Sequence, residues 1–203
     1  MGTLLNRRRY MGGGSALPYD AEVEYLQSVT GAKIVTDIYF DTTTKYTSTF
    51  GFGTISRRLL FTGIFGDNRD GYCGILPDGY VEVNGKDASN VNAANGTHVF
   101  VRAYVDDIKT VDGTAINKNE GAREGWFERP TYPLCIFTYQ YNAAVNCPDV
   151  KFYSATIEKN GVVTNQLIPV RIGTTGYIYD KVTGKLYGNA GTGDFILGND
   201  KTT

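Results

Sequence analysis

Cysteine, histidine and tryptophan are scarce in this chain, whose 203 residues include three, one and one of them. Cys73, Cys135 and Cys147 are odd in number and scattered, which argues against a disulfide framework and favours reduced thiols. No Cys-x-x-Cys pair occurs, and the single histidine, His98, has no cysteine cluster beside it in the sequence. The chain therefore lacks the ligand spacing that is typical of a transition-metal site.

Long apolar runs are missing as well. No segment approaches the roughly 18 apolar residues that cross a bilayer. Residues 1–17 do not form a signal peptide, because the arginines follow the leucines and no apolar run comes after them. We expect a soluble protein that is not exported.

A broad excess of positive charge is also absent. The net charge is −1, and Arg7, Arg8 and Arg9 contribute +3, so the rest of the chain carries −4. A protein that binds duplex nucleic acid has a broad basic face. This composition argues against that class of partner.

The residues that are abundant favour strands and turns. The chain has 25 Gly, 15 Tyr and 10 Phe, together with many Thr and Val and few helix-forming runs. Short alternating segments predict strands at 21–27, 32–40, 45–53, 56–66, 79–85, 98–107, 108–116, 134–142, 150–160, 162–172, 176–181, 184–188 and 194–198.

Turn signals separate several of these segments. Asn84-Gly85, Asp112-Gly113 and Asn160-Gly161 each lie between apolar alternations, which is the strongest short-range signal for a hairpin. Residues 112–133 form the longest stretch without periodicity and predict a long loop. The pattern predicts an all-β chain folded as an antiparallel β-sandwich of the jelly-roll kind.

The first residues, MGTLLNRRRYMGGGSAL, are unlike the rest of the chain. We divide the sequence into a basic arm with a glycine hinge (1–17) and a β-sandwich domain (18–203). The arm is too short to bury an apolar surface alone, so an ordered arm requires a partner. Its anchors for docking on an acidic surface are apolar side chains and arginine forks: Leu4, Leu5, Arg7, Arg8, Arg9 and Tyr10. The alternatives are a terminus without a role, a trimer bundled through its arms, and a contact with nucleic acid inside a particle.

Two phrases carry a resemblance to a known family. PYDAEVEYLQSVTGAKIVTDIYF near the start and GYIYDKVTGKLYGNAGTGDFILG near the end resemble those of LamG/concanavalin A-like domains in virion proteins of phages that infect Bacteroidales, including the crAss-like group. Leaders such as LLNRRRYMGGG also recur in front of such domains. The resemblance implies a LamG-like sandwich in a phage particle that assembles in the bacterial cytoplasm.

The stretch DAEVE offers candidate catalytic carboxylates. Alternation places Asp20, Glu22 and Glu24 on one face of a strand, as in the E-x-D-x-E pattern of concanavalin-like glycosidases. The first position is Asp rather than Glu, and the triplet lies at the very start of the domain. We interpret it as the solvated face of an edge strand. His98 stands at a strand start without a nucleophile motif, and we expect it to be structural, so the chain is not expected to be an enzyme.

Other candidate sites are binding sites. Asp67, Asn68 and Asp70 offer oxygen donors for calcium, which LamG-like domains often hold on loops, but the EF-hand spacing fails and a polar turn is the preferred interpretation. Trp126, Tyr139 and Tyr141 are candidates for stacking on glycans, although aromatic residues at alternate spacing on strands usually belong to the core. GNAGTG (188–193) lacks the Lys-Ser/Thr ending of a phosphate loop, and a turn before the last strand explains it.

These observations predict a structural virion protein. It would be a head decoration or a head-fibre subunit that docks on the capsid shell or fibre base through its arm, without a cofactor. The alternatives are a carbohydrate-binding module or a tail protein that contacts host glycans and, further from the pattern, a glycoside hydrolase.

Overall fold

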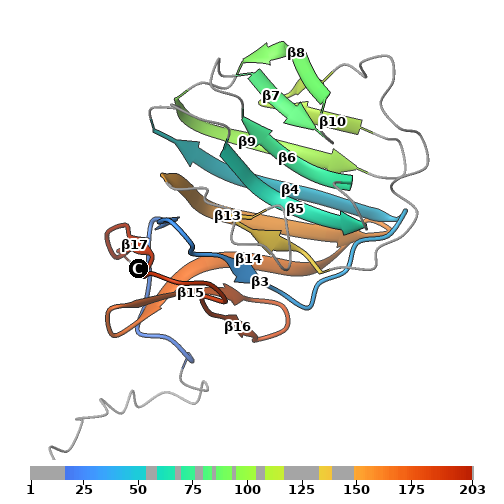
Figure 1. Cartoon of the computed structure of the whole chain (residues 1–203). Coiled ribbons are helices and arrows are strands. Elements are labelled where there is room, and N and C mark those ends of the chain that lie inside the picture. The colour runs from blue at the N-terminus through green and yellow to red at the C-terminus, as the bar shows by residue number, and fades with distance from the viewer. Residues whose placement is uncertain are drawn as a thin grey trace, which may run out of the picture.

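The protein is a two-layered antiparallel β-structure (Figure 1). A computed structural model describes residues 17–53, 59–66, 70–75, 80–83, 86–92, 95–103, 108–116, 133–138 and 149–202. Every regular element in these ranges is a strand, which confirms the expected all-β sandwich at the level of architecture. No helix among the described residues is long and apolar enough to span a membrane.

The larger sheet has 11 strands. Eight of them lie in the order β11 (Thr114–Ala115), β10 (Ile108–Val111), β9 (Gly96–Ala103), β4 (Thr44–Phe52), β13 (Val150–Lys159), β14 (Val162–Ile172), β15 (Thr175–Asp180) and β16 (Leu186–Tyr187). The other three are short: β1 (Ala21–Glu22) pairs with β14, β2 (Leu26–Gln27) pairs with β13, and β17 (Ile196–Leu197) pairs with β2.

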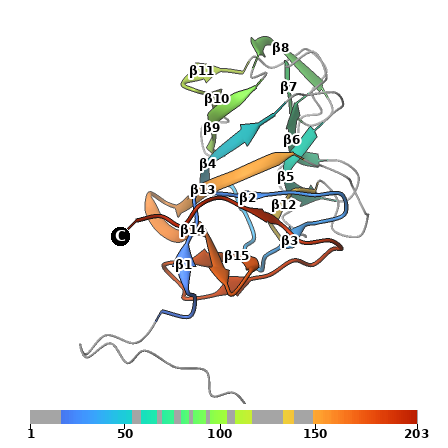
Figure 2. The ribbon, with the colours of Figure 1, turned by 90° about the vertical axis from the view of Figure 1, so that its left-hand side faces the viewer.

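The smaller sheet has six strands and faces the larger one (Figure 2). Its order is β3 (Ile34–Val35), β12 (Cys135–Ile136), β5 (Leu59–Gly66), β6 (Asp70–Ile75), β7 (Tyr80–Val83) and β8 (Lys86–Asn92). All pairings in both sheets are antiparallel, including the non-consecutive pairs such as β4 with β13.

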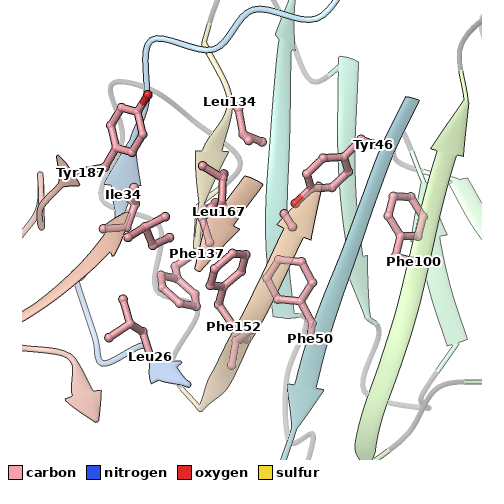
Figure 3. Close-up of a cluster of buried hydrophobic side chains, with 14 of the residues drawn as sticks. Leu26, Ile34, Tyr46, Phe50, Phe100, Leu134, Phe137, Phe152, Leu167 and Tyr187 are labelled. Carbon is pink, nitrogen blue, oxygen red and sulfur yellow. The ribbon is translucent and has the colours of Figure 1, made fainter. Parts of the chain in front are cut away.

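Alternation along two central strands builds the core. Tyr46 and Phe50 of β4 lie opposite Ile157 and Phe152 of β13, and all four are at most 1% exposed. The rings of Phe50 and Phe152 meet edge to face, with their centroids 5.5 Å apart (Figure 3). Burial of one such side chain contributes roughly 1.5–3 kcal/mol, so this cluster is a main source of stability.

Two of the three predicted hairpin turns are observed. Asp112-Gly113 and Asn160-Gly161 have φ values of 50° and 80°, and of 50° and 76°, which are the left-handed values that a two-residue type I′ turn requires. Strand pairing closes directly on each turn, at Val111 with Thr114 and at Lys159 with Val162. Asn84-Gly85 lies outside the described residues, between the paired β7 and β8.

Several predicted strand bounds are wrong. The segment 21–27 is broken by a bend at Glu24, and only Ile34–Val35 of the segment 32–40 is a strand. The segment 108–116 is a hairpin rather than one strand, so β11 lies inside the predicted long loop, of which residues 117–132 lie outside the described ranges. The pattern also missed β6, because GDNRDGY was interpreted as a polar turn, and β8, for which no strand was predicted over Lys86–Asn92.

Candidate functional site

The sequence-predicted docking and glycan sites lie outside the described residues. They comprise the docking residues Leu4, Leu5, Arg7, Arg8, Arg9 and Tyr10 and the glycan-stacking residues Trp126, Tyr139 and Tyr141. Of the calcium candidates, Asp67 and Asn68 lie outside as well, and Asp70 begins β6. The described candidates are therefore the DAEVE carboxylates, His98 and the two phrases that carry the resemblance.

Each DAEVE carboxylate contacts a different part of the chain. Asp20 Oδ2 accepts a 2.7 Å hydrogen bond from the backbone N–H of Gly173, in the turn between β14 and β15. Glu22 Oε1 pairs with Lys181 Nζ at 2.8 Å, just after β15. Glu24 Oε2 accepts from both the backbone N–H and the side-chain amide of Asn199, at 3.2 Å each. The three carboxylates thus join the start of the sandwich to later segments.

The electrostatics of Glu22 do not match those of a general acid. Partial burial raises the pKa of Glu22, but the hydrogen bond and charge of Lys181 outweigh it and lower the pKa below its ordinary value. A glycosidase acid needs a raised pKa so that it holds a proton near neutral pH. Burial and the neighbouring Glu22 also raise the pKa of Tyr19 to about 12, so this phenol remains a hydrogen-bond donor.

The first strand is not an edge strand, and the expectation that it would be one is wrong. On one edge, Asp20 N and Val23 N donate to Arg171 O at 2.9 Å and Pro169 O at 3.1 Å in β14. On the other edge, Glu24 N donates to Asn199 O at 2.9 Å, and Glu22 O accepts from Lys201 N at 2.9 Å. Sequence alternation does not reveal this second partner, because it comes from the other end of the described chain.

His98 is held by its surroundings at both ring nitrogens. Nδ1 lies 2.7 Å from Asp112 Oδ2, and Nε2 lies 3.0 Å from Asn95 O. The ring also stacks against Phe52, with centroids 6.2 Å apart. Both nitrogens lie within hydrogen-bond distance of an oxygen, so contacts with Asp112 and Asn95 hold the ring in one orientation. A structural role for His98 remains a prediction.

A buried carboxylate that the sequence analysis did not single out organises the turn after β15. Asp180 is 0% exposed and accepts four hydrogen bonds. The donors are Asn165 Nδ2 at 2.7 Å, Gln166 N at 2.9 Å, Val182 N at 3.0 Å and Thr183 Oγ1 at 2.7 Å. Burial raises the pKa of Asp180, but these hydrogen bonds outweigh it and hold the pKa below its ordinary value.

The sequence contains a signal for this turn. In Asp180-Lys181-Val182-Thr183-Gly184, the Asp side chain accepts from residues two and three positions ahead, as in an Asx turn. Gly184 then adopts a φ of 75°, which favours glycine. The phrase DKVTG therefore has a structural explanation within this chain.

The rest of the closing phrase folds over the loop that follows β2. Asn189 Oδ1 accepts from Lys33 N at 3.1 Å and from Gly191 N at 2.8 Å. A Cβ atom on Gly191 would lie 2.0 Å from Gly31 O, so only glycine fits there. The segment 188–193 lies between β16 and β17, as the turn interpretation of GNAGTG predicted.

A small aromatic group lies on the face of the larger sheet that points away from the core. Tyr25 and Tyr153 meet edge to face, with centroids 5.7 Å apart, and Lys151 Nζ lies 4.3 Å from the centroid of the Tyr25 ring. The ring of Tyr153 lies over Gly51, where a Cβ atom would approach Tyr153 Cε2 to 2.9 Å. All three side chains are half-buried. The group offers ring edges and a cation to an outside ligand.

No group of three or more metal-ligating side chains occurs within the described ranges. A scan of protein-family models and a search of curated proteins each found no match to this chain.

Proposed function

We propose that this chain is a structural protein of a bacteriophage particle. Residues 1–17 dock it to the capsid shell or fibre base, and a β-sandwich of the LamG/concanavalin A-like, jelly-roll kind is displayed outward as a head decoration or head-fibre subunit. The proposal rests on the resemblance of the two phrases and on the basic arm. The structural observation that supports the docking step is the attachment of residues 20–24, which follow the arm, to β14 on one edge and to residues 199–201 on the other.

In this proposal, docking lowers the conformational entropy of the arm and forms new contacts with the particle. The arm loses its freedom, and burial of Leu4 and Leu5 together with bidentate pairing of Arg7, Arg8 and Arg9 to carboxylates offsets that loss. Because the sandwich is fastened directly after the arm, one docking event places the whole domain. Many copies on one particle would give avidity to any weak contact of the displayed face.

Co-sedimentation with phage particles that lack this protein, or with shells of the major capsid protein, tests the proposal. The full chain should pellet with the particles, whereas a variant without residues 1–14 and the Arg7/Arg8/Arg9→Ala variant should stay in solution. The matched control is Arg7/Arg8/Arg9→Lys, which keeps the charge and loses the planar fork, and it should bind more weakly than the full chain. Equal behaviour of all variants would contradict the proposal.

The second candidate is a carbohydrate-binding module or tail protein that contacts host or mucosal glycans. The observation that favours it is the group of Tyr25, Tyr153 and Lys151 on the outward face, because aromatic rings beside polar groups suit sugar rings. A glycan array probed with the domain lacking residues 1–14 tests it, with Tyr153→Ala as the variant and a calcium chelator in a parallel arm. Glycan binding that survives loss of the arm and fails with Tyr153→Ala would favour this candidate.

A further inference from the structure

The start of the sandwich lies between β13 and β14, where these two long strands no longer pair with each other. β13 and β14 pair with each other only over Ala155–Lys159 and Val162–Leu167. Beyond that stretch, β1 pairs with Val170 and Arg171 of β14, and β2 pairs with Lys151 and Phe152 of β13. We call residues 19–27 the opening segment. Its Val23 and Leu26 are 0% exposed, so it forms part of the core as well as of the sheet.

A second segment covers the other edge of the opening segment. Residues 194–202, which we call the closing segment, run antiparallel to it, with Ile196 opposite Gln27 and Leu197 opposite Leu26 (Figure 2). Gly198 N donates to Tyr25 O at 2.9 Å, and Lys201 N donates to Glu22 O at 2.9 Å. The opening segment is therefore enclosed between the long strands and the closing segment.

The close approach of the two segments depends on a glycine. A Cβ atom on Gly198 would lie 2.9 Å from Glu24 Cβ and 2.9 Å from the Tyr25 backbone nitrogen. Atoms do not approach so closely, so any larger residue at this position must push the segments apart. The φ of Gly198 lies outside the left-handed region, so the requirement comes from contact and not from backbone strain.

Polar side chains fasten the closing segment to its neighbours. Arg171 of β14 forms a bidentate pair with Asp200, from Nε to Oδ1 at 2.7 Å and from Nη2 to Oδ2 at 2.6 Å. Arg171 Nη1 also donates to Gly173 O at 3.1 Å, in the turn whose N–H is bound by Asp20. One arginine thus joins the closing segment, β14 and the turn that holds the opening segment.

We infer that the closing segment is a strap that holds the opening segment in the sandwich, so that tension on residues 1–17 passes into the core instead of peeling the first strand away. The consequence for docking rests on the proposed function, but the strap itself is a property of the isolated domain. Without the strap, the opening segment keeps its pairing with β13 and β14 and loses its second edge. Local opening then becomes more frequent.

Hydrogen exchange of the full chain in solution tests the strap without any particle. The variant is Gly198→Ala, and the matched control is Gly53→Ala, where a Cβ atom meets nothing within 4 Å. In Gly198→Ala the amides of Asp20, Val23 and Glu24 should exchange at least about ten-fold faster, while amides at the centre of β4 and β13 keep their rates. Gly53→Ala should leave all these rates unchanged.

A protease that cleaves after glutamate gives an independent readout. The first two glutamates of the chain are Glu22 and Glu24, so cleavage there separates the arm from the sandwich. Gly198→Ala should be cut there several-fold faster than the unaltered chain. Asn199→Ala, which removes only the side-chain contact with Glu24, should show a smaller change in the same direction. If Gly198→Ala fails to fold, the cleavage rate of Asn199→Ala tests the strap instead.

Unchanged exchange and cleavage in folded Gly198→Ala and Asn199→Ala would overturn the strap. That result is separate from a failure of docking, because it is measured without particles. The opposite result is also distinguishable. If the unaltered chain fails to pellet with particles but Gly198→Ala exchanges faster, the closing segment still holds the opening segment, and only its role in docking is contradicted.

Discussion

Two turns of the larger sheet reverse the chain between adjacent antiparallel strands by different means: the turn between β13 and β14 and the turn between β15 and β16. The first uses Asn160 and Gly161 in left-handed conformations, with Gly161 facing open space. The second is organised around the carboxylate of Asp180, which is 0% exposed and bound by four donors. The first turn depends on left-handed backbone conformations, whereas the second adds a buried charge to the left-handed Gly184.

The difference teaches how each turn fails. An exposed turn that depends on φ loses only the energy of its strained backbone when its glycine is replaced. A turn built on a buried carboxylate loses more, because its removal takes the acceptor from four donors at once, one of which is the amide of the buried Asn165. The second turn also fixes β15 to β14 through Asn165 and Gln166, and its Lys181 pairs with Glu22 of the opening segment.

The largest effect is expected for Asp180→Ala. Loss of the carboxylate leaves the amide of the buried Asn165 without its acceptor and removes the acceptor of Gln166 N and Thr183 Oγ1, so the free energy of unfolding should fall by about 2–3 kcal/mol. Urea denaturation at pH 7 measures it. The matched control is Asp194→Ala, an exposed aspartate, which should change the free energy by less than about 0.5 kcal/mol. Similar values for the two variants would remove the distinction between the turns.

The pH dependence of the free energy of unfolding tests whether the charge of Asp180 stabilises the second turn. The pKa of Asp180 in the folded protein lies below its ordinary value, so the unfolded chain takes up the proton first as the pH falls. The stabilisation is therefore complete above the ordinary aspartate pKa and is lost as the pH drops through the folded-state pKa. Compared with Asp180→Asn, the unaltered chain should be more stable at pH 7, and the gap should narrow towards pH 3. A gap of constant size would contradict the charge-based explanation.

The same contrast explains how much the sequence could predict. Asn160-Gly161 and Asp112-Gly113 were identified as hairpin turns because their signal is local and lies within two residues. Alternation also predicted β4 and β13 correctly as strands, and these strands carry the buried Phe50 and Phe152. These contacts are decided by neighbours along the chain or by a simple period.

The candidate site was less predictable because its partners are remote in sequence. Glu24 and Asn199 are separated by 175 positions, and alternation alone described Glu24 as part of a solvated edge. Asp180 lies near the end of the predicted strand 176–181, and no local signal shows that its carboxylate is buried, since burial depends on how β14 packs beside it. β6 and β8 were missed for a related reason, because neither has a regular apolar alternation and each becomes a strand through pairing, β6 with β5 and β8 with β7.

A smaller effect is expected for Gly161→Ala. With a φ of 76° and no atom near the added Cβ, the only cost is that of a left-handed conformation, about 1 kcal/mol. Thermal or urea unfolding measures it. Gly53→Ala, which also faces open space but has no left-handed φ, should be neutral or slightly stabilising. A loss as large as that of Asp180→Ala would mean that the β13–β14 turn does more than set backbone direction.

The smallest effect is expected for a charge pair that joins two strands without burial. Lys45 of β4 and Glu158 of β13 lie opposite each other, with Nζ 3.0 Å from Oε1, and their side chains are 46% and 24% exposed. Water and salt screen such a pair, so a double-mutant cycle with Lys45→Ala and Glu158→Ala should give a coupling energy of about 0.5 kcal/mol or less. The coupling should fall further when salt is added. A coupling above about 1 kcal/mol would show that solvent exposure does not make this ion pair weak. The larger effect expected for Asp180 would then need a cause other than burial.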